Sequence, residues 1–123
     1  MSSRMLGSQF DGVPVGGVTH VSYRDLANFS SGDFEGTPVD DVMDDLQFAF
    51  DNRAVEHPHG RDLEHGGPRN YVNHLKKQIS RHGMQTPIEV TVSDEGHPEI
   101  YDGHHRAAAA IELGMRRVPV KRV

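Results

Sequence analysis

Five consecutive residues near the end of the chain have side chains that suit phosphate binding, DGHHR at positions 102–106. They stand directly before an uninterrupted helix-forming run, Ala107 to Leu113, and therefore at the turn where that helix begins. The first backbone N–H groups of a helix have no partner inside it, and the helix dipole adds partial positive charge there. Because Gly103 lets a ligand approach the backbone, and two imidazoles and a guanidinium add donors, the pattern indicates a site for phosphate or another anion.

Asp102 is the candidate cation ligand and proton acceptor of this turn, because its carboxylate is the acidic group next to the expected anion. A second interpretation explains the same residues without a ligand. In it, Asp102 caps the helix through its side chain, and His104 and His105 are solvated surface groups. The composition of the segment does not separate the two interpretations.

The elements around the turn follow from the spacing of apolar residues. Alternation predicts a strand over Pro87–Val92 and, after an Asp-Glu-Gly turn, a return strand over Pro98–Tyr101. Gly114 is the residue type that most often follows a helix end, because it adopts the left-handed backbone needed there. Val118 and Val120 then alternate with polar neighbours and predict a final strand.

Two helices are predicted ahead of these strands. One covers Asn70–His82, with apolar residues on one side and Gly83 as its stop. The other begins at Thr37, a capping residue that has Asp40 at capping-box distance, and forms a helical insertion at 37–52. Its apolar stripe consists of Val39, Val42, Met43, Leu46, Ala49 and Phe50, and its other surface is strongly acidic. We expect the acidic surface to be solvated; the alternative is a docking face for a basic partner.

The remaining segments carry weaker signals. Residues 1–17 are rich in Ser and Gly and are expected to be a flexible leader, so a single domain is predicted over 18–123. Residues 18–23 alternate weakly, as in a strand, and 25–36 are predicted as loop.

Residues 53–70 have almost no apolar side chains and are predicted to be a long polar loop. A connection of this length is either mobile or functional, and it could close over a ligand at the terminal turn. A zinc site is the other alternative, given nine histidines in the chain. We do not expect one, because His57 and His59 lack helical ligand spacing and no HExxH motif is present.

The stretch from Gln85 to Val123 resembles the nucleotide-binding core of the ParB/sulfiredoxin superfamily. Its DGHHR turn reads as in the free-serine kinases of this fold, where partition proteins have a Gly-Glu-Arg-Arg box and sulfiredoxin has Gly-Gly-Cys-His-Arg. The preceding YVNHLKKQISRHGMQTPI also resembles the helix and loop of the family. The resemblance implies an α/β fold: a small mixed sheet with flanking helices.

The resemblance also implies a function, which is binding of a nucleotide (ATP, ADP or CTP) with Mg²⁺, followed by phosphoryl transfer or nucleotide hydrolysis. The acceptor would be an unknown small molecule or protein. By resemblance, the phosphates are bound by Gly103, His105 and Arg106, with Thr86 and Pro87 in the loop near the nucleotide. Asp102 and His104 lie beside the phosphates as catalytic candidates, with Asp102 also the metal ligand. An acid from the first half is expected to deprotonate the acceptor, and Glu35 is our choice ahead of Asp33 and Asp25.

Other features limit what the resemblance carries over. His104 stands where sulfiredoxin has its cysteine, and the chain has no cysteine, so reduction of a sulfinic acid by that chemistry is excluded. Small proteins of this type are often labelled ParB-like nucleases, but no nuclease metal cluster is evident. The rival hypothesis is therefore a non-catalytic regulatory or DNA-associated protein that acts through protein partners.

Charge is distributed unevenly along the chain. Residues 1–65 contain 4 basic and 12 acidic residues, whereas 66–123 contain 9 basic and 6 acidic residues. The capacity to bind phosphate is therefore concentrated in the half with the DGHHR turn. Because the chain is acidic overall and ends after its last strand, we expect no strong sequence-specific DNA binding. No apolar run approaches a membrane span, so a soluble cytoplasmic protein is expected.

Overall fold

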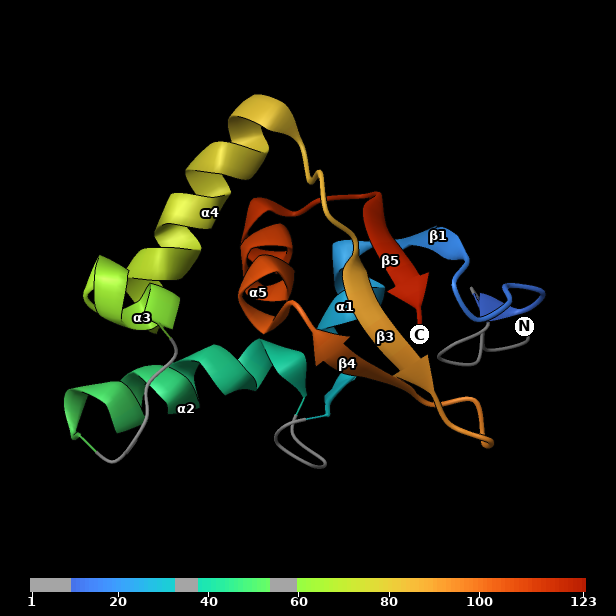
Figure 1. The fold of residues 1–123 in the computed structure, drawn as a ribbon, viewed down its shortest axis with the longest axis horizontal. Coiled ribbons are helices and arrows are strands. Elements are labelled where there is room, and N and C mark those ends of the chain that lie inside the picture. The colour runs from blue at the N-terminus through green and yellow to red at the C-terminus, as the bar shows by residue number, and fades with distance from the viewer. Residues whose placement is uncertain (1–9, 33–37, 54–59) are drawn as a thin grey trace.

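A five-stranded mixed sheet forms one side of the molecule and helices form the other (Figure 1). The computed structural model describes residues 10–32, 38–53 and 60–123. The order of strands across the sheet is β1-β5-β3-β4-β2. The strands are β1 (Val18–Val21), β2 (Ser30–Ser31), β3 (Ile88–Val92), β4 (Pro98–Asp102) and β5 (Val118–Arg122). The helices are α1 (Tyr23–Ala27), α2 (Val39–Asp51), α3 (Gly60–His65), α4 (Pro68–His82) and α5 (His104–Leu113).

The pairing of the strands makes the sheet mixed. β3 and β4 form the predicted antiparallel hairpin, and β1 lies antiparallel to β5. β5 runs parallel to β3, which requires a crossover, and β4 together with α5 forms this connection. The small α/β class with a mixed sheet and flanking helices, predicted from the sequence, is confirmed.

α5 lies between the sheet and helices α2 and α4, which explains its run of alanines (Figure 1). Ala107 and Ala110 belong to the core cluster that contains the buried faces of β3, β4 and β5. Ala108 and Ala109 belong to a second cluster, which contains Val42 of α2 and the buried residues of α4. All four alanines are buried, so small side chains are needed on both sides for the layers to approach α5 closely.

The N-terminal half contains more regular structure than the sequence predicted. Residues 25–36 were predicted as loop, but α1 and β2 begin within or just before this stretch. The Ser22 side chain accepts a hydrogen bond from the Asp25 N–H and caps α1. Residues 10–17 were predicted as part of the leader, yet Phe10 is buried in the core with its ring centroid 6.0 Å from that of Phe29.

The polar stretch 53–70 was also predicted as one loop, and its described part is largely helical. It contains α3 and the first turn of α4, which begins at Pro68, a residue suited to a first helical turn. α2 begins at Val39, two residues later than predicted, and Pro38 is its N-cap residue, with no side-chain cap bond. The predicted cap Thr37 lies outside the described residues, as do His57 and His59. In the described part of the chain, no helix has the length and apolar character needed to cross a membrane.

Candidate functional site

The DGHHR segment runs from the last residue of β4 into the first turn of α5, as the sequence predicted, and Gly103 is the one residue between the strand and the helix. Gly103 has φ 101° and ψ 31°, a left-handed backbone that other residues adopt at a cost. A Cβ atom at this position would lie 2.9 Å from Nη2 of Arg106, which is too close for an undisturbed contact. Glycine is therefore needed both for the backbone angle and for the passage of the Arg106 side chain over the turn.

The first turn of α5 contains hydrogen-bond donors and no acidic residue of its own. Gly103 occupies the N-cap position, no side chain caps the helix, and its first turn contains no acidic residue. The interpretation in which Asp102 caps α5 is therefore wrong. His104, His105 and Arg106 fill the first turn instead, so two imidazoles and a guanidinium stand where the dipole is already positive.

His104 points into the protein. It is buried, and its Nε2 lies 2.7 Å from Oγ of Ser31, which is also buried. Ser31 belongs to β2, the two-residue edge strand that pairs with β4, so this hydrogen bond ties the edge of the sheet to the start of α5. The interpretation of His104 as a solvated surface group is wrong.

His105 points towards α3 and α4. Its Nε2 lies 2.8 Å from Oδ1 of Asp62, and its ring centroid is 4.9 Å from that of Tyr71. The side chains of His105 and Asp62 are 15% and 7% exposed, so His105 is not a solvated group either. Asp62 was not among the predicted site residues, and no spacing in the sequence connects it with position 105.

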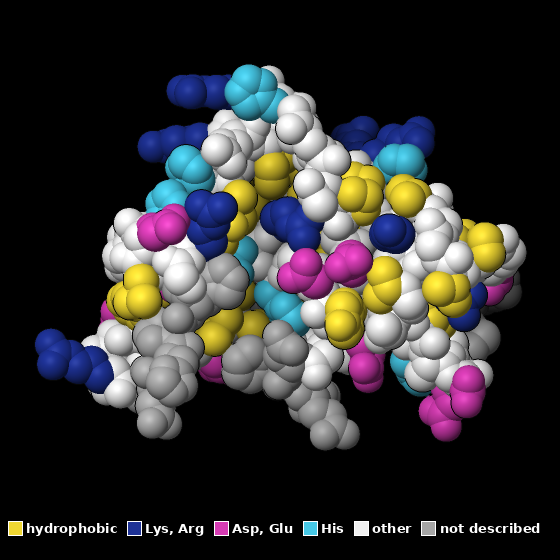
Figure 2. Space-filling model, in the orientation of Figure 1, with side chains coloured by type: hydrophobic (Ala, Val, Ile, Leu, Met, Phe, Trp, Pro, Cys, Tyr) yellow, Lys and Arg dark blue, Asp and Glu magenta, His cyan; other side chains and the backbone are white. Residues whose placement is uncertain are grey.

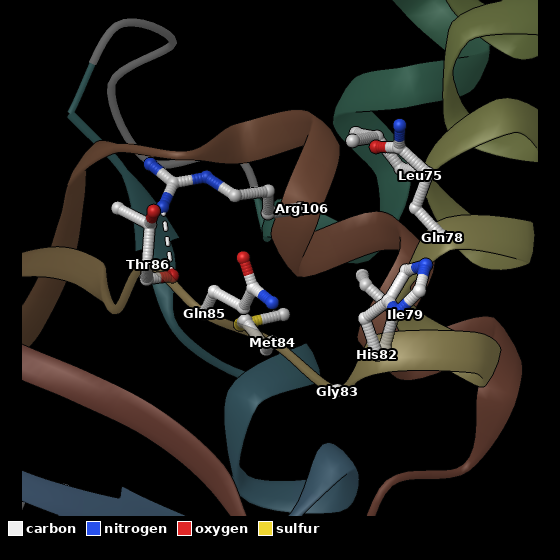
Figure 3. A pocket seen from close by; sticks show the side chains of 9 residues that line it. All are labelled: Leu75, Gln78, Ile79, His82, Gly83, Met84, Gln85, Thr86 and Arg106. Atoms are coloured by element: carbon white, nitrogen blue, oxygen red, sulfur yellow. Dashed lines mark hydrogen bonds between the residues drawn. The ribbon is translucent and has the colours of Figure 1, made fainter.

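Arg106 joins the turn to the loop ahead of β3 (Figure 3). Its Nη1 donates to the carbonyl oxygens of Thr86 at 2.9 Å and Pro87 at 3.0 Å. Its Nη2 lies 3.6 Å from Oδ2 of Asp102, whose side chain is 66% exposed. The structure thus brings together Arg106 and the Thr86–Pro87 loop, both of which the family resemblance implied to lie near the same ligand.

A pocket of about 260 Å³ lies next to Arg106, between the end of α4 and the loop that follows (Figure 3). Leu75, Ile79 and Met84 give it an apolar wall. Its polar lining consists of Gln78, His82, Gln85, Thr86 and Arg106. Figure 2 shows basic, acidic and histidine side chains next to one another at the centre of this face. An apolar wall beside convergent polar groups is typical of a small-molecule site.

Two predictions remain, which are the catalytic acid Glu35 and the metal site. Glu35, the expected acid from the first half, lies outside the described residues. Among the residues that the structure describes, no three His, Asp or Glu side chains are grouped to hold a metal ion.

Comparison with known proteins shows the family to which the second half of the chain is similar. The family model of the ParB N-terminal domain matches residues 59–123, which is more than half of the chain. The crystal structure of sulfiredoxin from Arabidopsis thaliana is similar with a TM-score of 0.47 and 17% sequence identity. This similarity covers 86% of the present chain and 83% of that chain. No curated protein matches the sequence.

Proposed function

Because the chain belongs to the ParB N-terminal domain family, we propose that it binds a nucleotide through its phosphates at the start of α5. One observation carries the proposal: the first turn of α5 holds His104, His105 and Arg106, has no side-chain cap and contains no acid. Cations at a helix N-terminus oppose the dipole and destabilise the helix. A bound phosphate reverses the sign of that interaction and accepts hydrogen bonds from the uncapped N–H groups.

Arg106 has the hydrogen-bonding capacity for this role. A guanidinium presents five N–H donors in a rigid fork, and the carbonyls of Thr86 and Pro87 take those of Nη1. The Nε and Nη2 edge faces the exposed carboxylate of Asp102, with Nη2 3.6 Å from Oδ2, and a phosphate oxygen would bind to this edge. In this arrangement Arg106 holds the Thr86–Pro87 loop against the turn and contacts the ligand with the same group.

The residues fit Mg²⁺ as a companion of the nucleotide. Mg²⁺ is commonly held by one or two carboxylates together with substrate phosphates, and it keeps several waters. Asp102, exposed and next to Arg106, is the carboxylate that would hold it. The ion would supply charge neutralisation on the phosphates.

The activity that we propose is phosphoryl transfer or nucleotide hydrolysis, with ATP, ADP or CTP as the nucleotide. Such reactions depend mainly on positioning and on stabilisation of charge, which the Arg106 and His105 side chains and the helix start would provide. A second candidate is a nucleotide-binding switch without chemistry. The observation in its favour is His104, a predicted catalytic residue that is buried against Ser31.

Titration calorimetry with ATP, ADP, CTP and GTP in the presence of magnesium tests the binding. Arg106→Lys keeps the charge but places its three donors on one nitrogen, without the planar fork that holds two carbonyls with one end and faces a phosphate with another edge. Binding should therefore weaken by about 1.5–3 kcal/mol, the size of a charged hydrogen bond. Arg116→Lys is the matched control, because Arg116 is exposed on the α5–β5 loop, and it should leave the affinity unchanged. Absence of heat with every nucleotide for the wild type refutes the proposal.

Incubation with magnesium and the nucleotide that binds, followed by chromatography, separates the two candidates. A phosphate product, formed by the wild type and lost in His105→Gln, supports the enzyme. An unchanged nucleotide in spite of binding supports the switch.

A further inference from the structure

α3 is held against the rest of the protein in an unusual way. Its one buried residue is Asp62, and its apolar residue Leu63 is 59% exposed. His65 of α3 also contacts two rings of α4: its centroid lies 5.2 Å from that of Tyr71 and 4.5 Å from that of His74. A six-residue helix without a buried apolar side chain gains little from the hydrophobic effect, so the carboxylate of Asp62 is its main anchor.

The Asp62 carboxylate pairs with His105 of α5. Oδ1 of Asp62 lies 2.8 Å from Nε2 of His105, at the distance of an ion pair. Among the described residues, however, this oxygen accepts no hydrogen bond of normal geometry. A buried carboxylate retains part of its desolvation cost even when it is paired, which limits how strongly Asp62 holds α3 in the docked position.

We propose that Asp62 takes the place of a phosphate oxygen at His105, and that docking of α3 and binding of phosphate exclude one another. The inference rests on the proposed function, because His105 is the residue given to the phosphate there. A carboxylate and a phosphate present the same chemistry to an imidazole N–H, which is an anionic oxygen acceptor. Two anions competing for one buried donor repel each other strongly, so the phosphate displaces Asp62.

This exclusion makes the site self-regulating. With no nucleotide, the Asp62 carboxylate lies against Nε2 of His105 and α3 is docked. When a nucleotide binds, α3 is released. By thermodynamic linkage the coupling is reciprocal. A change that stabilises docked α3 lowers the affinity for the nucleotide, and a change that frees α3 raises that affinity by the same factor.

Hydrogen exchange and calorimetry on Asp62→Asn test the proposal, with Glu64→Gln as the matched control. Glu64 lies on the same helix, is 61% exposed and contacts only Arg61 among the ion pairs of the described residues, so its replacement changes the charge of α3 without touching His105. We expect the amides of residues 61–66 to lose protection in Asp62→Asn without any nucleotide, and the nucleotide affinity to rise about five-fold or more. Glu64→Gln should change neither.

The wild type should show the reciprocal effect, with faster exchange over residues 61–66 when nucleotide and magnesium are added. Asp62→Ala, which removes the carboxylate entirely, should reproduce Asp62→Asn. Unchanged protection of the α3 amides in both variants, or a lower nucleotide affinity in both, overturns the inference. If the wild type binds no nucleotide, the proposed function fails, whereas the exchange of the ligand-free variants still reports separately whether Asp62 anchors α3.

Discussion

Replacing Gly103 by Ala is the sharpest test of how the turn is built, because it perturbs the backbone and Arg106 together. The left-handed backbone at φ 101° costs a non-glycine residue about 1–2 kcal/mol. The new Cβ would lie 2.9 Å from Nη2 of Arg106. The arginine is flexible and moves away readily, but it then loses its bonds to the carbonyls of Thr86 and Pro87.

The size of the second effect follows from those two bonds. A hydrogen bond from a charged donor contributes about 1.5–3 kcal/mol, but the displaced guanidinium, already 20% exposed, bonds to solvent instead, which offsets more than half of the loss of the two bonds. Taking about 1.5–2 kcal/mol for the pair after this correction, we expect Gly103→Ala to lower the free energy of unfolding by about 2.5–4 kcal/mol.

Gly114→Ala is the matched control at the other end of α5. Gly114 has φ 65°, and a Cβ there meets nothing within 4 Å, so only the backbone cost of about 1–2 kcal/mol applies. Urea denaturation of both variants measures the difference. In an Arg106→Ala background the cost of Gly103→Ala should fall to that of Gly114→Ala, because the displaced partner is already gone. Equal costs for the two glycines in the wild-type background would refute the role given to Arg106.

Three further predictions concern the packing around the site. Ser31→Ala removes the 2.7 Å hydrogen bond to His104 and should destabilise the protein by about 0.5–1.5 kcal/mol in a urea melt, whereas Ser80→Ala, at an exposed position of α4, should not. Glu112→Gln removes the negative charge that pairs α5 with Arg69 and Lys76 of α4. Because these side chains are partly exposed, the free energy of unfolding should fall by no more than about 1 kcal/mol, and by less in high salt. A cost that does not depend on salt would contradict an ionic origin. Leu46→Ala should cost less than the 2–5 kcal/mol typical of a fully buried leucine, since Leu46 is only partly buried against the second cluster, and an unchanged thermal melt would show that α2 contributes little there.

The parts of the fold that the sequence predicted are those with local signals. The β3–β4 hairpin, α5 and β5 follow from alternation, a turn and a helix stop within one contiguous stretch. α1 and α3 were missed because they span five and six residues and each buries a single side chain, Leu26 and Asp62, so neither produces an apolar stripe. The burial of Phe10 depends on a distant partner, Phe29, and no local pattern indicates it.

The candidate site divides in the same way. The DGHHR turn is contiguous, so its residues were identified together, and the resemblance to the family supplied Thr86 and Pro87. The contacts of the two histidines with Ser31 and Asp62 come from β2 and α3, and only the tertiary structure brings them to the turn. The burial of one acidic residue in a polar segment would have pointed to Asp62 as a site residue. Burial cannot be predicted, however, where all neighbouring residues in the sequence are polar too.

The most direct test of nucleotide binding is an NMR titration of the ¹⁵N-labelled wild type with the nucleotide, with magnesium present throughout. The phosphate site predicts saturable shifts of the backbone amides of residues 103–107 and of Thr86, because these groups surround the start of α5. The matching nucleoside, which has the same base and sugar but no phosphate, should leave the amides of residues 103–107 unshifted at the same concentrations. Equal shifts with nucleoside and nucleotide, or no shift at these amides at saturating nucleotide, would contradict a phosphate site at the start of α5.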